Sequence, residues 1–165
     1  MTFLAAISSV LAVACGPDTS SATYLDGSLL VTAAHAVSDG VCRVDGRLIP
    51  KTYSSRLDDV VYGEMSLPGV KAMPYSCEPM TPGEVYVMIG HARSVEGEVS
   101  DRYANIRSPA LAHMRIVTGL ADPGMSGGPV VSKDGVVFGV VSARNVQMGV
   151  TFVKELRDTP ICKAA

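Results

Sequence analysis

The sequence predicts an all-β fold, because short apolar runs alternate with turn residues along the chain. Turn signals such as Asp45-Gly46 and Thr81-Pro82-Gly83 separate these runs. The chain has no Trp and only three Phe, so β-branched residues and Met must fill much of its interior. Its 165 residues are enough for one sizeable core or for two small barrels that share an interface.

Strands are expected where apolar residues cluster between the turns. In the first half we predict strands over 10–14, over the run that ends at His35, and over 40–44, 47–49 and 60–65. The segment 73–83 is rich in Pro and polar residues and is the expected link between the two halves. In the second half we predict strands over 85–89, 103–107, 110–117, 130–132, 136–142 and 150–153, with one helical turn over 153–157.

The N-terminal residues raise a targeting question. Residues 3–14 are apolar and end in Ala12-Val13-Ala14-Cys15, which faintly suggests a bacterial signal or lipoprotein cleavage site. The run lacks a basic segment before it and is too short to span a bilayer. We favour a buried first strand over 10–14, because its removal would leave a barrel short of one wall.

Composition and cysteine spacing exclude several classes of partner. The formal net charge is −2 and there is no basic run, so we expect neither a nucleic-acid nor a membrane partner. Cys15, Cys42, Cys77 and Cys162 are widely scattered without a CxxC pair, so no metal site is expected. We expect free thiols in a reducing compartment. A Cys15–Cys42 bridge remains the alternative in an oxidising one.

Residues 124–129 read GMSGGP and are the strongest chemical signal in the chain. A serine is a poor nucleophile unless a base takes its proton and amide groups hold the oxyanion that forms. Gly124 has the backbone freedom to turn its N–H toward the same point as that of Ser126, so this pair is the predicted oxyanion hole. Taken alone, the motif is also compatible with an ordinary glycine-rich turn.

A base and a carboxylate are available upstream. The apolar run 28–34 ends in Thr32-Ala33-Ala34 and delivers His35 to the end of a strand. Asp59 opens the next apolar run, so its carboxylate can orient the imidazole from a neighbouring strand. Asp58 is the competing candidate. We therefore predict His35, Asp59 and Ser126 as the catalytic residues.

The order His35, Asp59, Ser126, with TAAH before and GMSGGP after, resembles that of the chymotrypsin-like (PA clan) serine proteases. Residues 134–142 resemble the hairpin that follows the nucleophile in this family. The resemblance implies two packed six-stranded antiparallel β-barrels with the active site in the cleft between them. The N-terminal barrel (1–75) would carry His35 and Asp59, and the C-terminal barrel (76–165) would carry Ser126 and the substrate pocket. No cofactor is expected.

Within the family, the chain lacks the features of digestive enzymes. Ala36 follows His35, and Met125 stands where those enzymes have an aspartate before the serine. Compactness and the GMSG sequence make it resemble proteases released from polyproteins of positive-strand RNA viruses, of the astrovirus or arterivirus type. This implies a serine endopeptidase that cuts its own polyprotein in the host cytoplasm. The alternative is a bacterial high-temperature-requirement (HtrA) type domain, periplasmic or secreted, supported by the strand over 83–90.

The resemblance also implies which residues form the substrate pocket. An apolar wall would favour apolar substrates, Asp122 a basic residue and Arg144 an acidic one, unless these two charges pair with each other. Ser142 would donate a hydrogen bond toward the triad aspartate, and the backbone after it would pair with an extended substrate. The residues of the pocket are Leu120, Ala121, Asp122 and Pro123 on one side, and Val141, Ser142, Ala143 and Arg144 on the other.

Two further expectations concern activity. His91 and His113 are expected to be ordinary surface or core residues, with His91 a weaker candidate for lining the cleft. The rate should rise as His35 loses its proton, around pH 6 to 7 if its pKa is unperturbed. A catalytically inactive binding module with the same fold is the second class of function that the sequence leaves open.

Overall fold

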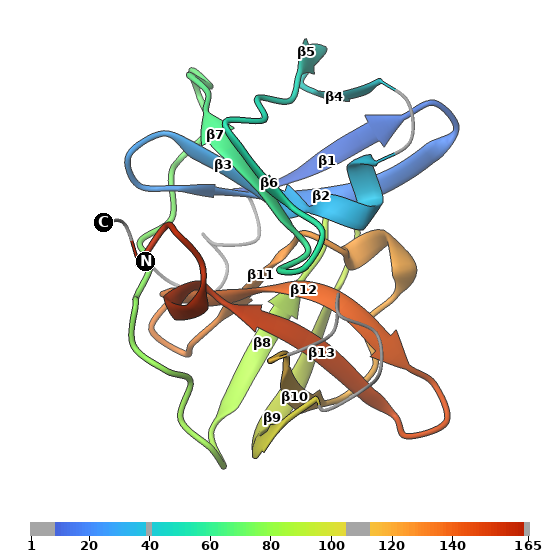
Figure 1. The fold of residues 1–165 in the computed structure, drawn as a ribbon, viewed down its shortest axis with the longest axis vertical. Coiled ribbons are helices and arrows are strands. Elements are labelled where there is room, and N and C mark those ends of the chain that lie inside the picture. Colours follow the sequence, from blue (N-terminus) through green and yellow to red (C-terminus); the bar gives the residue numbers. More distant parts are fainter. Residues whose placement is uncertain (1–8, 39–40, 105–112, 164–165) are drawn as a thin grey trace.

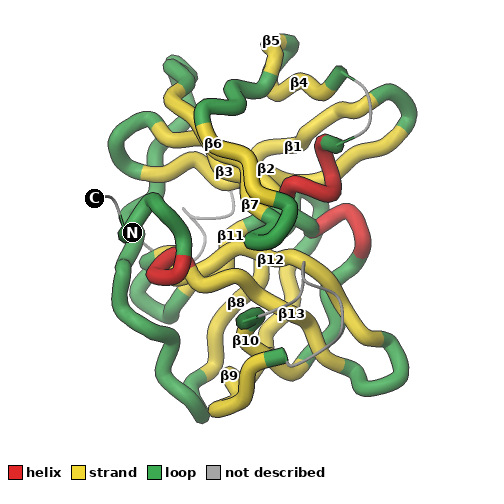
Figure 2. The backbone as a smooth tube through the Cα atoms, viewed as in Figure 1, coloured by secondary structure: helices red, strands yellow, loops and turns green. Residues whose placement is uncertain are grey.

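The computed structural model describes residues 9–38, 41–104 and 113–163, and it is built from two packed β units (Figure 1). Helix in these ranges is confined to short 3₁₀ segments, coloured red in Figure 2. These are η1 (Ala34–Val37), η3 (Pro123–Met125) and η4 (Leu156–Asp158). The all-β fold class is therefore confirmed.

The first unit is a curled antiparallel sheet in the order β5-β4-β1-β2-β3-β7-β6. Its end strands β5 and β6 have only two and three residues, and no pairing joins them. This unit differs in detail from the expected six-stranded barrel, because the described sheet has seven strands and curls without closing. The strands are β1 (Val10–Cys15), β2 (Asp18–Leu25), β3 (Leu29–Ala33), β4 (Cys42–Val44), β5 (Arg47–Leu48), β6 (Tyr53–Ser55) and β7 (Val60–Glu64).

The second unit is a closed six-stranded barrel in the order β10-β13-β12-β11-β8-β9. Its strands are β8 (Val85–Ile89), β9 (Ser94–Tyr103), β10 (Arg115–Thr118), β11 (Pro129–Val131), β12 (Val137–Asn145) and β13 (Val150–Glu155). The pairing of β12 with β13 shifts register between Val141 and Ala143, so Ser142 sits at an irregularity of the barrel wall. The segment 65–84 connects the two units and contains the expected boundary at 75/76.

Three strands differ from the sequence-based expectation for a common reason. The segments β2, β6 and β9 are rich in Ser, Thr and charged residues, so no clear apolar alternation marks them. We expected strands over 103–107 and 110–117, and the structure has β9 and β10 instead. Residues 105–112 of those predictions lie outside the described part of the chain.

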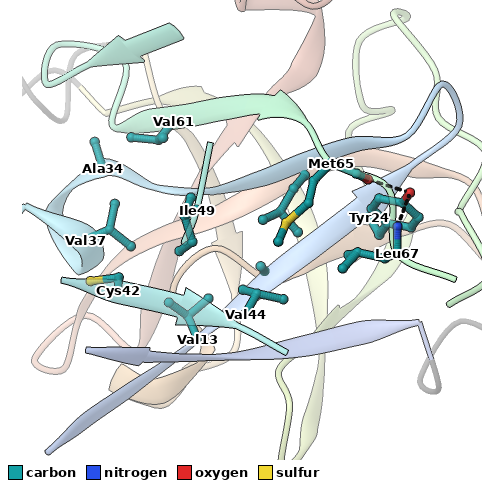
Figure 3. Close-up of a cluster of buried hydrophobic side chains, with 12 residues drawn as sticks. Val13, Tyr24, Ala34, Val37, Cys42, Val44, Ile49, Val61, Met65 and Leu67 are labelled. Atoms are coloured by element: carbon teal, nitrogen blue, oxygen red, sulfur yellow. Dashed lines mark hydrogen bonds between the residues drawn. The ribbon is translucent and has the colours of Figure 1, made fainter. Parts of the chain in front are cut away.

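Apolar side chains fill each unit and the interface between them. Figure 3 shows the cluster inside the first sheet, where Tyr24 donates a hydrogen bond to the carbonyl oxygen of Met65 at 2.7 Å. A second cluster joins the units, because Leu25, Val31 and Val60 from the first pack with residues of the second. The partners from the second unit include Ile89, Val131, Val137, Val140 and Leu156. Burial of this interface fixes the position of one sheet relative to the other.

Both pairs of cysteines form disulfides, so the expectation of free thiols is wrong. Cys15 is bonded to Cys42 within the first sheet, where these residues are also directly paired across β1 and β4. Cys77 is bonded to Cys162 and ties the connecting segment to the C-terminal turn. The spacing in the sequence could not show this, because both pairs come together only through sheet pairing and chain return.

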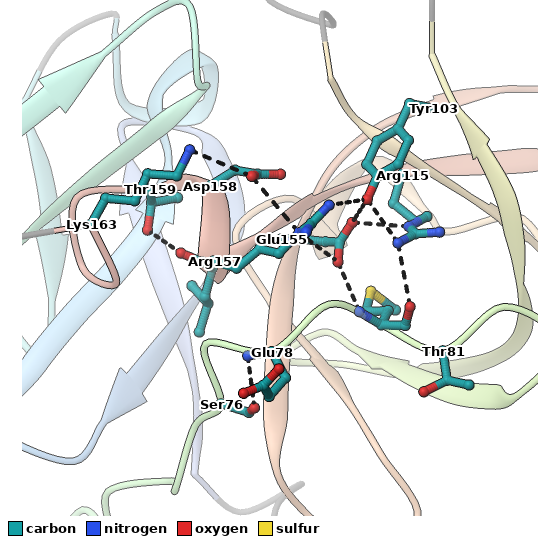
Figure 4. Close-up of polar contacts among 12 residues, drawn as sticks. Ser76, Glu78, Thr81, Tyr103, Arg115, Glu155, Arg157, Asp158, Thr159 and Lys163 are labelled. Carbon is teal, nitrogen blue, oxygen red and sulfur yellow. Dashed lines mark hydrogen bonds and ion pairs between the residues drawn. The ribbon is translucent and has the colours of Figure 1, made fainter.

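A buried polar cluster joins β9, β10 and β13 to the segment that connects the two units (Figure 4). Glu155 is fully buried and accepts hydrogen bonds from the Arg115 Nε (2.9 Å), the Tyr103 hydroxyl (2.7 Å) and the Met80 amide (2.8 Å). Burial raises the pKa of Glu155, but these donors outweigh it and hold the pKa below its usual value. The carboxylate is thus a charged link between β13, β10, β9 and the connecting segment.

Replacing Glu155 with Ala should lower the free energy of unfolding by about 3–5 kcal/mol, because the buried Arg115 guanidinium loses its carboxylate. Urea denaturation followed by circular dichroism measures this loss. The matched control, Glu78→Ala, removes an exposed carboxylate and should change the free energy by less than about 0.5 kcal/mol. An equal effect of both substitutions would show that the cluster does not stabilise the barrel.

Candidate active site

Ser126 lies between η3 and β11, in a turn that only glycine permits. Gly127 has φ +88°, and a Cβ on it would lie 2.2 Å from the carbonyl oxygen of Ser21. A Cβ on Gly128 would lie 2.0 Å from the carbonyl oxygen of Ile89. The two glycines after Ser126 therefore let this turn pack directly against the backbones of β2 and β8, which fixes the position of Ser126.

His35 and Asp59 meet at the ends of two paired strands. The register of β3 with β7 places Ala33 opposite Val60, so the residues that extend these strands are neighbours. Asp59 has φ +55° and turns its carboxylate toward η1. Its Oδ1 accepts a hydrogen bond from the His35 amide at 2.8 Å, and its Oδ2 lies 2.7 Å from His35 Nδ1. This contact selects the tautomer that leaves Nε2 free.

The second unit contributes a third hydrogen bond to the same carboxylate. Ser142 donates from its hydroxyl to Asp59 Oδ2 at 2.5 Å, and both residues are buried. The irregularity in β12 lets Ser142 point toward the first sheet. Asp59 is consequently hydrogen-bonded to both units. The resemblance implied this hydrogen bond from Ser142 to the triad aspartate.

Asp58, the competing candidate, faces a different group. Its Oδ1 lies 3.1 Å from the ammonium of Lys154, a β13 residue whose side chain is almost fully buried. Its Oδ2 accepts a hydrogen bond from the Tyr53 hydroxyl at 3.1 Å. Asp58 therefore anchors the turn that carries Asp59, and the structure directs Asp59 toward the imidazole.

Ser126 and His35 line one cleft of about 330 Å³ between the two units. The imidazole is half exposed, whereas Ser126 is buried except for its face in the cleft. The Ser126 hydroxyl donates to the carbonyl oxygen of Ser142 at 3.4 Å, a long hydrogen bond that a small side-chain rotation can replace. The arrangement brings an alcohol and an oriented imidazole to the same opening.

The loop over residues 122–126, here called the oxyanion loop, is closed in the sense that one of its own carbonyl groups occupies an amide that an oxyanion would need. The Ser126 amide donates to the carbonyl oxygen of Pro123 at 3.4 Å, within the turn of η3. Gly124, whose freedom we expected to be used, has no positive φ, and Gly127 uses it instead. The two predicted amides are thus not both free here, and Gly124 and Ser126 as oxyanion donors stay a prediction. Forming that site requires the Pro123–Gly124 peptide to rotate.

Side chains outside the predicted set hold this loop in place. The Ser21 hydroxyl donates to the carbonyl oxygen of Gly124 at 2.8 Å, and it also lies 3.1 Å from His91 Nδ1. Asp122 forms an ion pair with Arg93 at 2.8 Å. Sequence reasoning missed Ser21 and Arg93, because nothing local marks them. His91 is exposed beside this loop and is not among the described residues that line the cleft, which agrees with the expectation of an ordinary surface residue.

The predicted substrate wall is more closed than the sequence suggested. Arg144 donates to the carbonyl oxygen of Ala121 at 3.2 Å, so its guanidinium spans the gap between the two sides of the predicted pocket. The suggestion that Asp122 and Arg144 pair with each other is wrong, since Asp122 pairs with Arg93. Val141 and Ala121 are buried in the barrel interior, Leu120 and Ala143 are partly buried, and Pro123 is exposed.

The site offers no arrangement for a metal ion. Within residues 9–38, 41–104 and 113–163, no three His, Cys, Asp or Glu side chains are grouped as ligands. His113 is exposed and lies away from the cleft lining. In the same ranges, none of the helices has the length and apolar character needed to cross a bilayer.

Comparison with solved structures identifies the fold. The sequence matches no protein-family model, and no curated protein is significantly similar to it. The active form of the Rv3671c protease from M. tuberculosis superposes with a TM-score of 0.74 over 98% of this chain and 82% of that chain, at 16% identity. The fold is that of the chymotrypsin-like serine proteases.

Two further structures extend this likeness. An HtrA-type protease, AlgW, solved with a tripeptide, has a TM-score of 0.77 at 19% identity, over 94% of this chain and 60% of that chain. The serine endoprotease from Yersinia pestis has a TM-score of 0.73 at 16% identity, over 94% and 62%. This chain thus spans about 60% of each of these two proteins.

The Asp59 contact has a consequence for pH dependence. The hydrogen bond to Asp59 raises the pKa of His35 above its usual value, although burial opposes the shift. A base must be neutral, so activity should fall as the pH drops through this raised pKa. The structure therefore places the expected acid limb of kcat/KM at a higher pH than an unperturbed histidine would give.

The variant Asp59→Asn should shift this limb to lower pH and reduce kcat by about 10³–10⁴-fold, because the tautomer is no longer selected. A pH profile of kcat/KM for both proteins measures the two effects together. An unchanged limb in the variant would show that Asp59 does not act on the base.

Proposed function

We propose that the chain is a serine endopeptidase that cleaves polypeptides through an acyl-enzyme. The observation that carries the proposal is the bonding of Asp59 to the His35 ring and to Ser142, directly behind a cleft that His35 shares with Ser126. This is the geometry of an oriented general base beside an alcohol. A chymotrypsin-like fold alone would not carry it, since folds host many functions.

The proposed reaction uses each of these residues in turn. His35 Nε2 takes the proton of Ser126 as its oxygen attacks the substrate carbonyl carbon, and Asp59 stabilises the imidazolium. The developing oxyanion accepts hydrogen bonds from the Gly124 and Ser126 amides. This requires the hydrogen bond between the Ser126 amide and the Pro123 carbonyl oxygen to break. His35 then gives the proton to the leaving amine, and water hydrolyses the ester by the same steps in reverse.

For the substrate and its context we favour the bacterial alternative over the viral one. The three similar structures named above include an HtrA-type protease and a serine endoprotease from Yersinia pestis, and this favours the bacterial alternative. Two disulfides fit an oxidising compartment such as the periplasm or the exterior better than a reducing cytoplasm. We therefore propose a polypeptide substrate outside the cytoplasm and set aside the processing of its own polyprotein.

A catalytically inactive binding module is the second candidate. The closed oxyanion loop favours it, because the Ser126 amide is already bonded within the loop. The hydrogen bonds that orient the His35 ring through Asp59 argue against it, because a binding module does not need an oriented base. Activity measurements separate the two candidates.

The discriminating experiment is cleavage of a mixed peptide library, read by mass spectrometry. Wild-type protein should cleave a defined subset, and Ser126→Ala should lower the rate by about 10⁴–10⁶-fold without loss of folding. The matched control, Ser54→Ala, alters an exposed serine in β6 and should cleave like wild type. Equal cleavage by wild type and Ser126→Ala would exclude Ser126 as the nucleophile.

The proposed compartment has its own test. Protein isolated from its native source should show no alkylatable thiol under non-reducing, denaturing conditions, because all four cysteines are bonded. Mass spectrometry after iodoacetamide treatment counts the modified sites. Four modified cysteines in fresh protein would place the chain in a reducing compartment.

A further inference from the structure

The cleft beside Ser126 lies on one particular side of the nucleophile. Its walls come from the β1–β2 hairpin, η1 and the oxyanion loop, including Thr19, Ala36 and Pro123. No residue of β12 lines it, although the β12 backbone after Ser142 is the segment expected to pair with an extended substrate. His35, which must protonate the leaving amine, is in this lining. The cleft is therefore placed to receive the substrate residues that follow the scissile bond.

An open strand edge runs along this cleft. The Ser21 amide of β2 donates to the carbonyl oxygen of Ser126 at 3.0 Å, so this edge of β2 faces the nucleophile loop. Backbone groups two residues apart in a strand point to the same side, so those of Thr19 face the cleft too. The neighbouring strand β3 pairs with β2 only from Ala22 onward. The Thr19 carbonyl oxygen also lies 3.6 Å from where a Cβ of Gly124 would be.

Asp18 gives this cleft its charge. It begins β2, lines the cleft with Ser20 and is exposed to solvent. Within the part of the chain that the structure describes, its carboxylate has neither a hydrogen bond nor an ion pair, whereas Asp58, Asp59 and Asp122 are all paired. No lysine or arginine is in the described lining, and His35 is the one lining residue besides Asp18 that can carry charge, because Cys15 is bonded in a disulfide.

We infer that Asp18 is a specificity-determining residue that selects a Lys or Arg side chain within the first two substrate residues after the scissile bond. The inference rests on the proposed function, because it assigns a substrate class to that site. An unpaired carboxylate at a cleft wall attracts a cationic side chain, and its attraction is strongest where the bound chain excludes water. A solvent-exposed pair gives a preference of about two- to fivefold.

The test uses a peptide that the library assay shows to be cleaved. Three versions carry Lys, Gln or Glu at both of the first two positions after the scissile bond, and kcat/KM is measured for each. Wild type should prefer Lys over Gln and Gln over Glu, by about two- to fivefold per step, and added salt should shrink the differences. Asp18→Asn should remove the preference, and Asp18→Lys should reverse it.

The control Asp26→Lys makes the same change in charge at the opposite end of β2, in an exposed turn. It should keep the wild-type order, which separates a local effect from that of net charge. An unchanged order in Asp18→Lys, or an equal reversal in Asp26→Lys, would overturn the inference while cleavage itself continued.

A binding measurement distinguishes failure of the inference from failure of the proposed function. Fluorescence anisotropy with labelled Lys and Glu peptides and the Ser126→Ala protein reports binding without turnover. If wild type cleaves nothing, yet the Lys peptide binds more tightly and Asp18→Lys reverses this order, the cleft preference stands and the peptidase assignment fails. Equal binding of both peptides in all variants would exclude a role for Asp18.

Discussion

The Asp59 carboxylate is the contact on which the rest of the site depends. It is buried, and it accepts hydrogen bonds from the His35 amide, the His35 ring and the Ser142 hydroxyl. A buried carboxylate without such partners is costly, so its donors are held where they are. Because two donors come from the first sheet and one from the second, the same group that orients the base also locks the two units together. Lys154 of the second unit also forms an ion pair with Asp58, the residue before Asp59, across the same interface.

Strand β2 has a comparable double role between the sheet and the nucleophile loop. Its Ser21 amide bonds the Ser126 carbonyl, its Thr23 hydroxyl donates to the Gly127 carbonyl at 2.9 Å, and its buried side chains are largely small and polar. This explains why a strand with little apolar character is buried. Strand β2 packs against the GMSGG loop, and its first residues, Asp18 and Thr19, line the cleft. Fold and specificity therefore meet in one strand.

Much of the architecture could be predicted, because the chemistry-bearing motifs are local in sequence. GMSGGP and TAAH carry their own turn and strand signals, and the fold class follows from short apolar runs. What could not be predicted depends on distant segments meeting. The disulfides, the Arg93–Asp122 pair and the Ser21–Gly124 hydrogen bond join residues up to 103 positions apart. Polar strands such as β2 and β9 are recognisable only through their partners, and the closed loop reflects an alternative peptide orientation that no residue type specifies.

The central claim is that Ser126 attacks a carbonyl while His35 takes its proton and the oxyanion loop opens. A crystal structure of the protein after reaction with a peptidyl phosphonate tests this most directly. The account predicts phosphorus bonded to Ser126 Oγ, one phosphonate oxygen within hydrogen-bond distance of the Gly124 and Ser126 amides, and the Pro123 carbonyl turned away. Phosphorus on another residue, or an adduct on Ser126 with the Pro123 carbonyl still bonded to the Ser126 amide, would contradict it.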